Sequence, residues 1–261
     1  MAQPEITQPE ITDPILVVKN LAFEIKGQAI LRDVSFSVNR GEIFGVMGLS
    51  GTGKSTLLKL IMGLISASNG EIFVNGHPIV GQSERQLMEI RAQMGMCFQY
   101  AALFDSMSVF ENVAFGLRRR TALNEEEITQ KVTTALNEVG MGDTAHKKPS
   151  ELSGGMKKRV GVARALVMDP LLLLYDEPSA GLDPIISAVI DELIVKLRDR
   201  LNMTSVVVTH EVDELFSISD RIMMIHEGYV VACDTPDVLQ SSSNTIVQQF
   251  VHGLPEGPIK V

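Results

Sequence analysis

The stretch GLSGTGKST, residues Gly48–Thr56, decides the fold. It lies between an apolar run, Ile43–Met47, predicted to be a buried strand, and a helix predicted from Lys54 onward. Its first and third glycines, Lys54 and Ser55 satisfy the spacing G-x-x-x-x-G-K-[ST]. Glycine lets the backbone approach a phosphate group without a Cβ clash. The stretch therefore predicts a strand–loop–helix unit that binds the phosphates of a nucleotide.

Two side chains of this loop carry its chemistry. Lys54 is expected to reach the β- and γ-phosphates, and the Ser55 hydroxyl is expected to coordinate Mg²⁺. We count Lys54 also among the catalytic candidates. The predicted nucleotide contacts of the loop are Gly48, Ser50, Gly51, Thr52, Gly53, Lys54, Ser55 and Thr56.

A second run, LLLLYDEP at Leu171–Pro178, ends in two carboxylates. Four leucines and a tyrosine need cover on both faces, which is typical of a central parallel strand. Such a strand delivers Asp176 and Glu177 to the carboxyl end of the sheet, where α/β folds bind ligands. Asp176 is predicted to be a Mg²⁺ partner, usually through water. Glu177 points differently and is predicted to be the general base for the attacking water.

A third stretch, LSGGMKKR at Leu152–Arg159, is another serine- and glycine-rich helix start suited to an anion. The first and third stretches are two halves of a phosphate site that cannot close on each other within one chain. They therefore predict a nucleotide held between two copies of the chain.

The composition limits the class of protein. The chain has 261 residues, 45% of them apolar, and no apolar stretch is long enough to span a bilayer. The first residues lack a basic region followed by an apolar core, so we expect a cytosolic protein. A formal net charge of -9 argues against nucleic acid as a partner. Cys97 and Cys233 have no metal-ligand spacing and are expected to be reduced, semi-buried thiols.

The order of patterns along the chain indicates a parallel α/β core interrupted by helices. Residues 1–14, which contain the repeat QPEIT twice, are expected to be a flexible tail. The main domain is predicted at 15–246, with a helical subdomain at about 105–165, and a C-terminal segment at 247–261.

Together with SAGLD at Ser179–Asp183 and VVVTH ending at His210, these stretches occur in the order and spacing of ABC transporter nucleotide-binding domains. The chain resembles that family from about residue 15 to residue 257. The resemblance implies an α/β P-loop NTPase of the ABC ATPase fold, with a RecA-like parallel-sheet core, an antiparallel β edge and an inserted helical subdomain. It also implies ATP hydrolysis with ATP and Mg²⁺ as cofactors.

The resemblance assigns further site residues. Gln99 matches the glutamine that contacts Mg²⁺ and relays to the membrane subunit. Ser153, Gly154 and Gly155 match the signature that caps the γ-phosphate bound by the opposite protomer. Asp183 matches the aspartate that tunes the dimer interface, and His210 matches the histidine that bonds toward the γ-phosphate as a catalytic and ATP-binding residue.

The adenine contact departs from the family pattern. These domains usually place an aromatic residue on the first strand, but the matching position here is Ile25, and Phe23 lies two residues earlier. Either Ile25 packs against the base, or the register shifts and Phe23 serves.

The segment Phe98–Leu117, the signature ending in Met156, and the C-terminal run Val247–Ile259 resemble the ATPases of MCE-type lipid transport systems. This narrower resemblance implies phospholipid transport that maintains outer-membrane lipid asymmetry. It places Tyr100, Ala101 and Phe104 in an apolar patch for a membrane subunit, with Leu103 mostly in the core.

The implied partners are a second copy of the chain, membrane permease subunits, an MCE-domain lipid-binding protein and a small STAS-domain protein. The implied location is the cytoplasmic face of the bacterial inner membrane, through the permease. DNA-repair ABC ATPases split their site with long insertions, and ribosomal ones carry two cassettes. This chain has neither feature. The first open alternative is therefore an import or export ATPase for another cargo, and a non-transport ABC ATPase comes after it.

Overall fold

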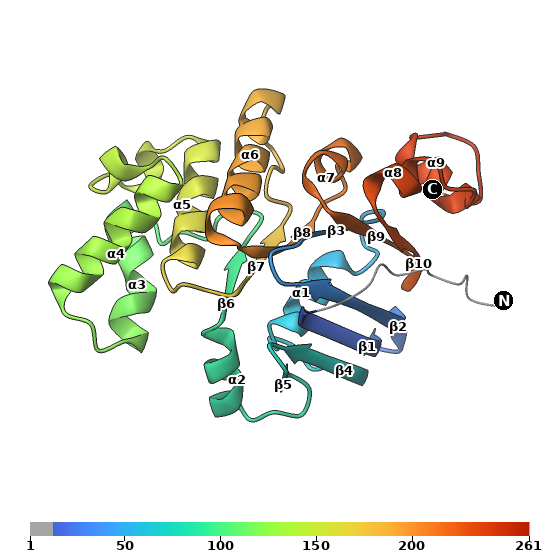
Figure 1. The fold of residues 1–261 in the computed structure, drawn as a ribbon, viewed down its shortest axis with the longest axis horizontal. Coiled ribbons are helices and arrows are strands. Elements are labelled where there is room, and N and C mark those ends of the chain that lie inside the picture. The colour runs from blue at the N-terminus through green and yellow to red at the C-terminus, as the bar shows by residue number, and fades with distance from the viewer. Residues whose placement is uncertain (1–12, 261) are drawn as a thin grey trace.

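The computed structural model describes residues 13–260, and Figure 1 shows two sheets with helices packed around them and a helical block at one end. Most of the predicted tail, 1–14, therefore lies outside the described residues. Strand β1 (Pro14–Ile25) already begins at Pro14, which pairs with Asn39. The other predicted domain limits stay predictions.

The larger sheet has six strands and is parallel except at one edge. Its strands, in spatial order, are β10 (Tyr229–Asp234), β9 (Arg221–His226), β3 (Ile43–Met47), β8 (Thr204–Val208), β7 (Leu172–Asp176) and β6 (Met94–Cys97). Only β10 runs antiparallel to its neighbour among these described strands. This sheet is the predicted parallel core.

The antiparallel strands form a sheet of their own. Its order is β2 (Gln28–Asn39), β1, β4 (Asn69–Val74) and β5 (His77–Pro78). A backbone hydrogen bond of 2.7 Å from the Arg32 N–H to the Gly228 carbonyl oxygen joins β2 to the turn between β9 and β10. The predicted antiparallel part is thus attached at the β10 side of the parallel sheet.

The helical block follows β6 and contains the helices whose starts the sequence marks most clearly. It comprises α3 (Val109–Arg120), α4 (Glu125–Glu138), the 3-10 turns η1 (Gly142–Thr144) and η2 (Pro149–Glu151), and α5 (Gly154–Leu166). Ser108 and Asn124 accept backbone N–H bonds in capping boxes at the starts of α3 and α4. Ser153 caps α5 through its Oγ.

The remaining helices pack around the sheets. They are α1 (Lys54–Ile61), α2 (Glu84–Arg91), α6 (Pro184–Leu201), α7 (Val212–Ile218), α8 (Pro236–Gln240) and α9 (Thr245–Val251). The predicted boundary at residue 247 falls inside α9, and Gln249 on that helix exchanges two hydrogen bonds with the Ile259 backbone. Among residues 13–260, no helix combines the length and apolar character needed to cross a membrane.

The central strands are buried on both faces, as their uninterrupted apolar sequences predict. Every residue of β3, β7 and β8 is buried. Alternate residues join two separate apolar clusters: Leu173 and Tyr175 pack on the side of α3–α6, and Leu172 and Leu174 on the side of α1 and β1. Each strand therefore belongs to both cores, which fixes its register.

Both cysteines are free and are more deeply buried than expected. Cys97 and Cys233 are 7% and 4% exposed rather than semi-buried. Burial raises the pKa of the Cys97 thiol to about 12 and that of Cys233 to about 11. Both side chains therefore act as small apolar groups of the core.

A buried ion pair joins the two sheets. The guanidinium of Arg221 on β9 donates to Glu42 at 2.6 and 3.1 Å and to the Ser37 carbonyl oxygen of β2 at 2.7 Å. The side chains of Arg221 and Glu42 are 5% and 8% exposed. Glu42 also accepts from the Asn39 N–H at 2.7 Å. This network holds β2 at a fixed position against the parallel sheet.

We predict that Arg221→Met lowers the free energy of unfolding by about 3–5 kcal/mol, because it leaves the Glu42 carboxylate buried and unpaired. Equilibrium unfolding in urea measures the loss. Lys196→Met, which breaks the exposed Lys196–Glu192 pair on α6, is the matched control and should cost less than about 1 kcal/mol. Equal losses in the two variants would contradict this role of the buried pair.

Candidate nucleotide-binding site

The parallel sheet brings four separate stretches to one edge. Strands β3, β8, β7 and β6 are successive parallel neighbours, so their carboxyl ends meet. The phosphate loop follows β3, and Gln99 follows β6. Glu177 follows β7 directly, and Thr209 and His210 follow β8. Residues separated by more than a hundred positions therefore share one site.

A cleft of about 420 Å³ lies at this edge. From the phosphate loop it is lined by Ser50, Gly51, Gly53, Lys54, Ser55 and Thr56. Gln99, Glu177 and His210 line it from the other strand ends, and Phe23, Ile25 and Ile30 line it from the antiparallel sheet. The cleft thus has a polar end at the strand termini and an apolar end at β1 and β2.

Two predicted loop contacts face away from this cleft. Gly48 lies against β9, where a Cβ atom would come within 2.4 Å of the Ile225 carbonyl oxygen. The Thr52 hydroxyl turns back into the loop and donates to the Leu49 carbonyl oxygen at 2.8 Å. Gly48 is therefore required by packing within the chain, and Gly53, at φ +98°, is the glycine that shapes the start of α1.

Lys54 is buried inside the loop. Its Nζ donates to the carbonyl oxygens of Gly48 at 2.8 Å and Leu49 at 3.1 Å. Burial lowers the pKa of Lys54, and the carboxylates of Glu177 and Asp176 partly oppose that shift. A poorly hydrated ammonium beside free backbone N–H groups gives the loop a strong preference for an anion.

Ser55, which lines the cleft, bonds to Asp176. The Ser55 Oγ, in the first turn of α1, donates to Asp176 Oδ1 at the end of β7 over 2.7 Å. Hydroxyl and carboxylate oxygens are the ligand types that Mg²⁺ prefers. The arrangement gives a divalent cation two adjacent oxygen donors, and Gln99 lines the same cleft.

Glu177 is the most constrained residue of the site. Its backbone has φ +49°, a left-handed conformation that costs a non-glycine residue on the order of 1–3 kcal/mol. Its N–H donates to the Val208 carbonyl oxygen at 2.8 Å. Its Oε2 lies 3.0 Å from the Thr209 hydroxyl, which donates to it, and 2.9 Å from His210 Nδ1. Both contacts fall on one oxygen, so none of the described side chains donates to Oε1.

Two residues that contact Glu177 are absent from the sequence predictions. Thr209 stands immediately before His210 in VVVTH, so its place at the same strand end could have indicated this contact. Lys158 stands within LSGGMKKR, yet its Nζ donates to the Glu177 carbonyl oxygen at 3.0 Å. No local pattern indicates that contact, because the two residues belong to different elements.

The signature residues and Asp183 lie outside the cleft. Ser153 and Gly154 are exposed at the start of α5, and Gly155 is buried against α6. Asp183 caps α6 and accepts from the N–H groups of Ile185 and Ile186, both at 3.1 Å. Neither helix start contributes to the cleft of its own chain.

The structure does not decide between the two residues predicted to contact adenine. Ile25 is half exposed and Phe23 is partly buried against the core, and both line the apolar end of the cleft.

The patch after Gln99 differs from the prediction at one residue. Tyr100 and Phe104 are 86% and 43% exposed, but Ala101 is only 3% exposed. Ala101 has φ +57° and packs on Gly161 of α5, and its carbonyl oxygen accepts from Arg164 at 2.7 Å. The prediction that Ala101 faces a partner is wrong, because the turn that presents Tyr100 directs Ala101 inward. Leu103 is partly buried against the core.

Similarity to known proteins agrees with this geometry. Residues 31–180 match the family model described as ABC transporter. The intermembrane phospholipid transport system ATP-binding protein MlaF of Haemophilus influenzae is 44% identical, over 94% of this chain and 93% of that protein. The probable ribonucleotide transport ATP-binding protein mkl of Mycobacterium leprae is 40% identical, over 93% of this chain and 70% of its own.

Solved structures show the same fold. CbiO1 of Clostridium perfringens, part of an ABC transporter complex, has a TM-score of 0.82 at 33% identity and covers 94% of this chain and 97% of its own. The ATP-binding cassette MJ0796, solved as a dimer bound to ADP and phosphate, has a TM-score of 0.77 at 30% identity. The match covers 85% of this chain and 98% of that one. The predicted fold class is confirmed, and this chain belongs to the ABC transporter family and is an ATPase of that family.

Proposed function

We propose that this ATPase drives phospholipid transport between membranes as a subunit of a transport complex. The observation that supports phospholipid as the cargo is the 44% identity to a phospholipid transport ATP-binding protein, which spans nearly the whole of both chains. The similarity to mkl names ribonucleotide transport and makes another cargo the competing proposal.

For hydrolysis, we assign Glu177 as the general base. Thr209 and His210 hold its Oε2, which leaves Oε1 to accept a proton from water. Lys54 and the loop N–H groups would bind the phosphates. Ser55, Asp176 and Gln99 would hold Mg²⁺, which would neutralise phosphate charge and orient the γ-phosphate. The contact of 2.7 Å between Ser55 and Asp176 supports this set.

The site would be completed by a second copy of the chain. Ser153, Gly154, Gly155 and Asp183 are turned away from the cleft of their own chain, as a site shared between protomers requires. The dimeric MJ0796 structure, which holds ADP and phosphate, supports the same arrangement. We place Ser153–Gly155 on the γ-phosphate of the opposite protomer.

Tyr100 and Phe104 form the proposed coupling surface toward permease subunits. Their exposure next to Gln99, which lines the nucleotide cleft, supports this role. The resemblance to ATPases of MCE-type lipid transport systems adds two proposed partners, an MCE-domain protein and a small STAS-domain protein. The complex would lie at the cytoplasmic face of the bacterial inner membrane. Co-purification with the membrane subunits and mass spectrometry of the bound lipid tests the cargo, and a purified complex without phospholipid would contradict it.

We predict that Glu177→Gln binds ATP and hydrolyses it at least roughly a hundredfold more slowly, the scale of losing a general base. The variant should accumulate as an ATP-bound dimer, because closure requires the nucleotide and not its cleavage. Phosphate release and gel filtration with ATP measure the two effects. Lys54→Ala is the contrasting variant and should weaken nucleotide binding itself. Wild-type turnover by Glu177→Gln would remove the assignment.

We predict partial complementation between Lys54→Ala and Ser153→Arg chains. A mixed dimer contains one intact site and one site broken twice, whereas either homodimer contains two broken sites. Chains carrying different affinity tags allow the mixed dimer to be isolated before its ATPase rate is measured. If isolated mixed dimers show no more activity than the homodimers, the shared-site proposal fails.

We predict that Tyr100→Asp prevents assembly with the permease and leaves ATP binding by the free chain unchanged. Docking would bury an unpaired carboxylate at a cost of several kcal/mol, while no residue of the nucleotide cleft is altered. Pull-down with the membrane subunits and ATP affinity are measured side by side. Tyr229→Asp on β10 is the matched control and should assemble normally. Intact assembly of Tyr100→Asp would show that this surface is not the contact.

A further inference from the structure

The backbone of Glu177 is held from both sides in its left-handed conformation. On one side its N–H donates to the Val208 carbonyl oxygen of β8 at 2.8 Å. On the other side its carbonyl oxygen accepts from Lys158 Nζ at 3.0 Å, and the Ala180 N–H approaches the same oxygen at 3.3 Å. The closer of the two donors on the carbonyl side is thus a side chain that comes from helix α5.

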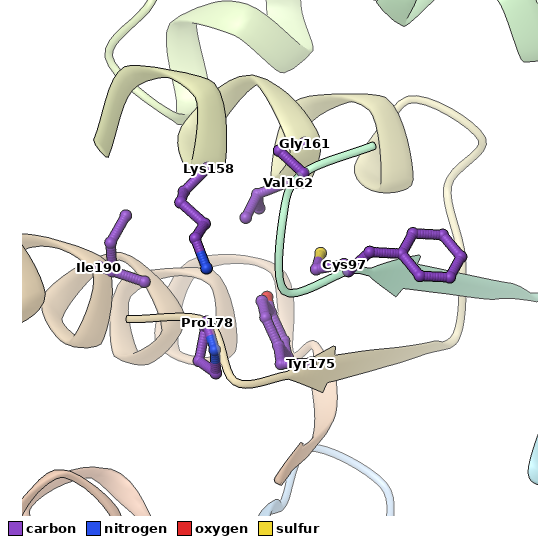
Figure 2. A pocket seen from close by; sticks show the side chains of 9 residues that line it. Cys97, Lys158, Gly161, Val162, Tyr175, Pro178 and Ile190 are labelled. Atoms are coloured by element: carbon purple, nitrogen blue, oxygen red, sulfur yellow. The ribbon is translucent and has the colours of Figure 1, made fainter. Parts of the chain in front are cut away.

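Lys158 lines a narrow pocket together with Tyr175 and Pro178, which are close to Glu177 in the chain. In Figure 2 its amine points from α5 toward the ends of Pro178 and Tyr175, with Cys97 and Ile190 on either side. The pocket has about 10 Å³ of free volume, which is room for about one water molecule. The Lys158 side chain is thus partly buried at this place.

Partial burial of Lys158 strengthens its hydrogen bond to the Glu177 carbonyl oxygen. Among residues 13–260, the Glu177 carbonyl oxygen is the one hydrogen-bond acceptor of Lys158 Nζ. Burial lowers the pKa of Lys158, and nearby anionic groups, Glu177 first among them, oppose that shift. A partly buried ammonium bonded to a carbonyl oxygen makes a stronger contact than a fully hydrated lysine at the surface.

We propose that Lys158 is a positioning residue for hydrolysis: its ammonium holds the peptide unit after Glu177, so that the carboxylate stays in its reactive orientation. The proposal rests on the proposed role of Glu177 as general base. Thr209 and His210 fix the Glu177 side chain from the β8 side, but they do not restrain the peptide that follows it. Without the Lys158 contact, the longer bond from the Ala180 N–H is left to hold this carbonyl oxygen. The peptide is then less restrained in the left-handed conformation and can move the carboxylate with it.

The test is a double-mutant cycle between Lys158→Met and Glu177→Gln, measured as steady-state ATPase rates. Methionine keeps the length and apolar stem of the side chain and removes the donor. Lys158→Met alone should lower kcat by about 10- to 100-fold, the scale of a displaced catalytic group, with KM and ATP affinity within about twofold. In the Glu177→Gln background the same change should alter the residual rate by less than about twofold.

The controls separate positioning from folding and from the parent proposal. Lys196→Met, at an exposed position of α6, should keep wild-type kcat, and Lys158→Met should keep its thermal midpoint close to wild type. A wild-type kcat for Lys158→Met overturns the inference, as does lost ATP affinity, a large fall in the thermal midpoint, or an equal loss of rate in the Glu177→Gln background. The proposed function fails separately, if Glu177→Gln alone retains its turnover.

Discussion

Strand β8 is the constraint on which the site depends. It lies between β3 and β7, and backbone bonds continue past the strand ends, from the Glu177 N–H to Val208 and from the Thr209 N–H to Val46 at 3.4 Å. Two inter-strand spacings, roughly 9–10 Å, therefore separate the end of β3, where the phosphate loop begins, from the end of β7, which Glu177 follows. Because β3, β7 and β8 belong to both apolar cores, this separation cannot change without disturbing the whole sheet.

The parts of the molecule that follow from local patterns were predictable from the sequence. Continuous apolar runs indicate the central strands, and a G-x-x-x-x-G-K-S loop indicates the strand–loop–helix unit. The carboxyl end of the sheet, where α/β folds bind ligands, is then the predicted place of Asp176 and Glu177. These inferences need only the neighbours of each residue and one rule of sheet topology.

The rest depends on partners that are distant in sequence. Ala101 reads as part of an apolar exposed run, yet it is buried because two successive left-handed residues, Ala101 and Ala102, turn the chain and Arg164 holds their carbonyl oxygens. Gly48 reads as a phosphate-loop glycine, yet the Ile225 backbone is what excludes a side chain there. Lys158 carries no local signal of its contact with Glu177. In each case a tertiary contact, and not the local pattern, determines the position.

The two helix starts that face away from the cleft contact each other. A Cβ atom on Gly155 would lie 2.4 Å from Ile186 Cγ2 of α6, and one on Gly154 would lie 3.1 Å from Leu182. Two glycines thus allow the start of α5 to pack directly on the start of α6, where Asp183 is the cap. A shift of the signature residues relative to Asp183 would therefore disturb this packing. Helix α5 also carries Lys158 and Arg164. Lys158 donates to the Glu177 carbonyl oxygen, and Arg164 donates to the Ala101 carbonyl oxygen in the turn after Gln99. In the proposed shared site, a displacement of the N-terminus of α5 would therefore reach both places through side-chain contacts of a single helix.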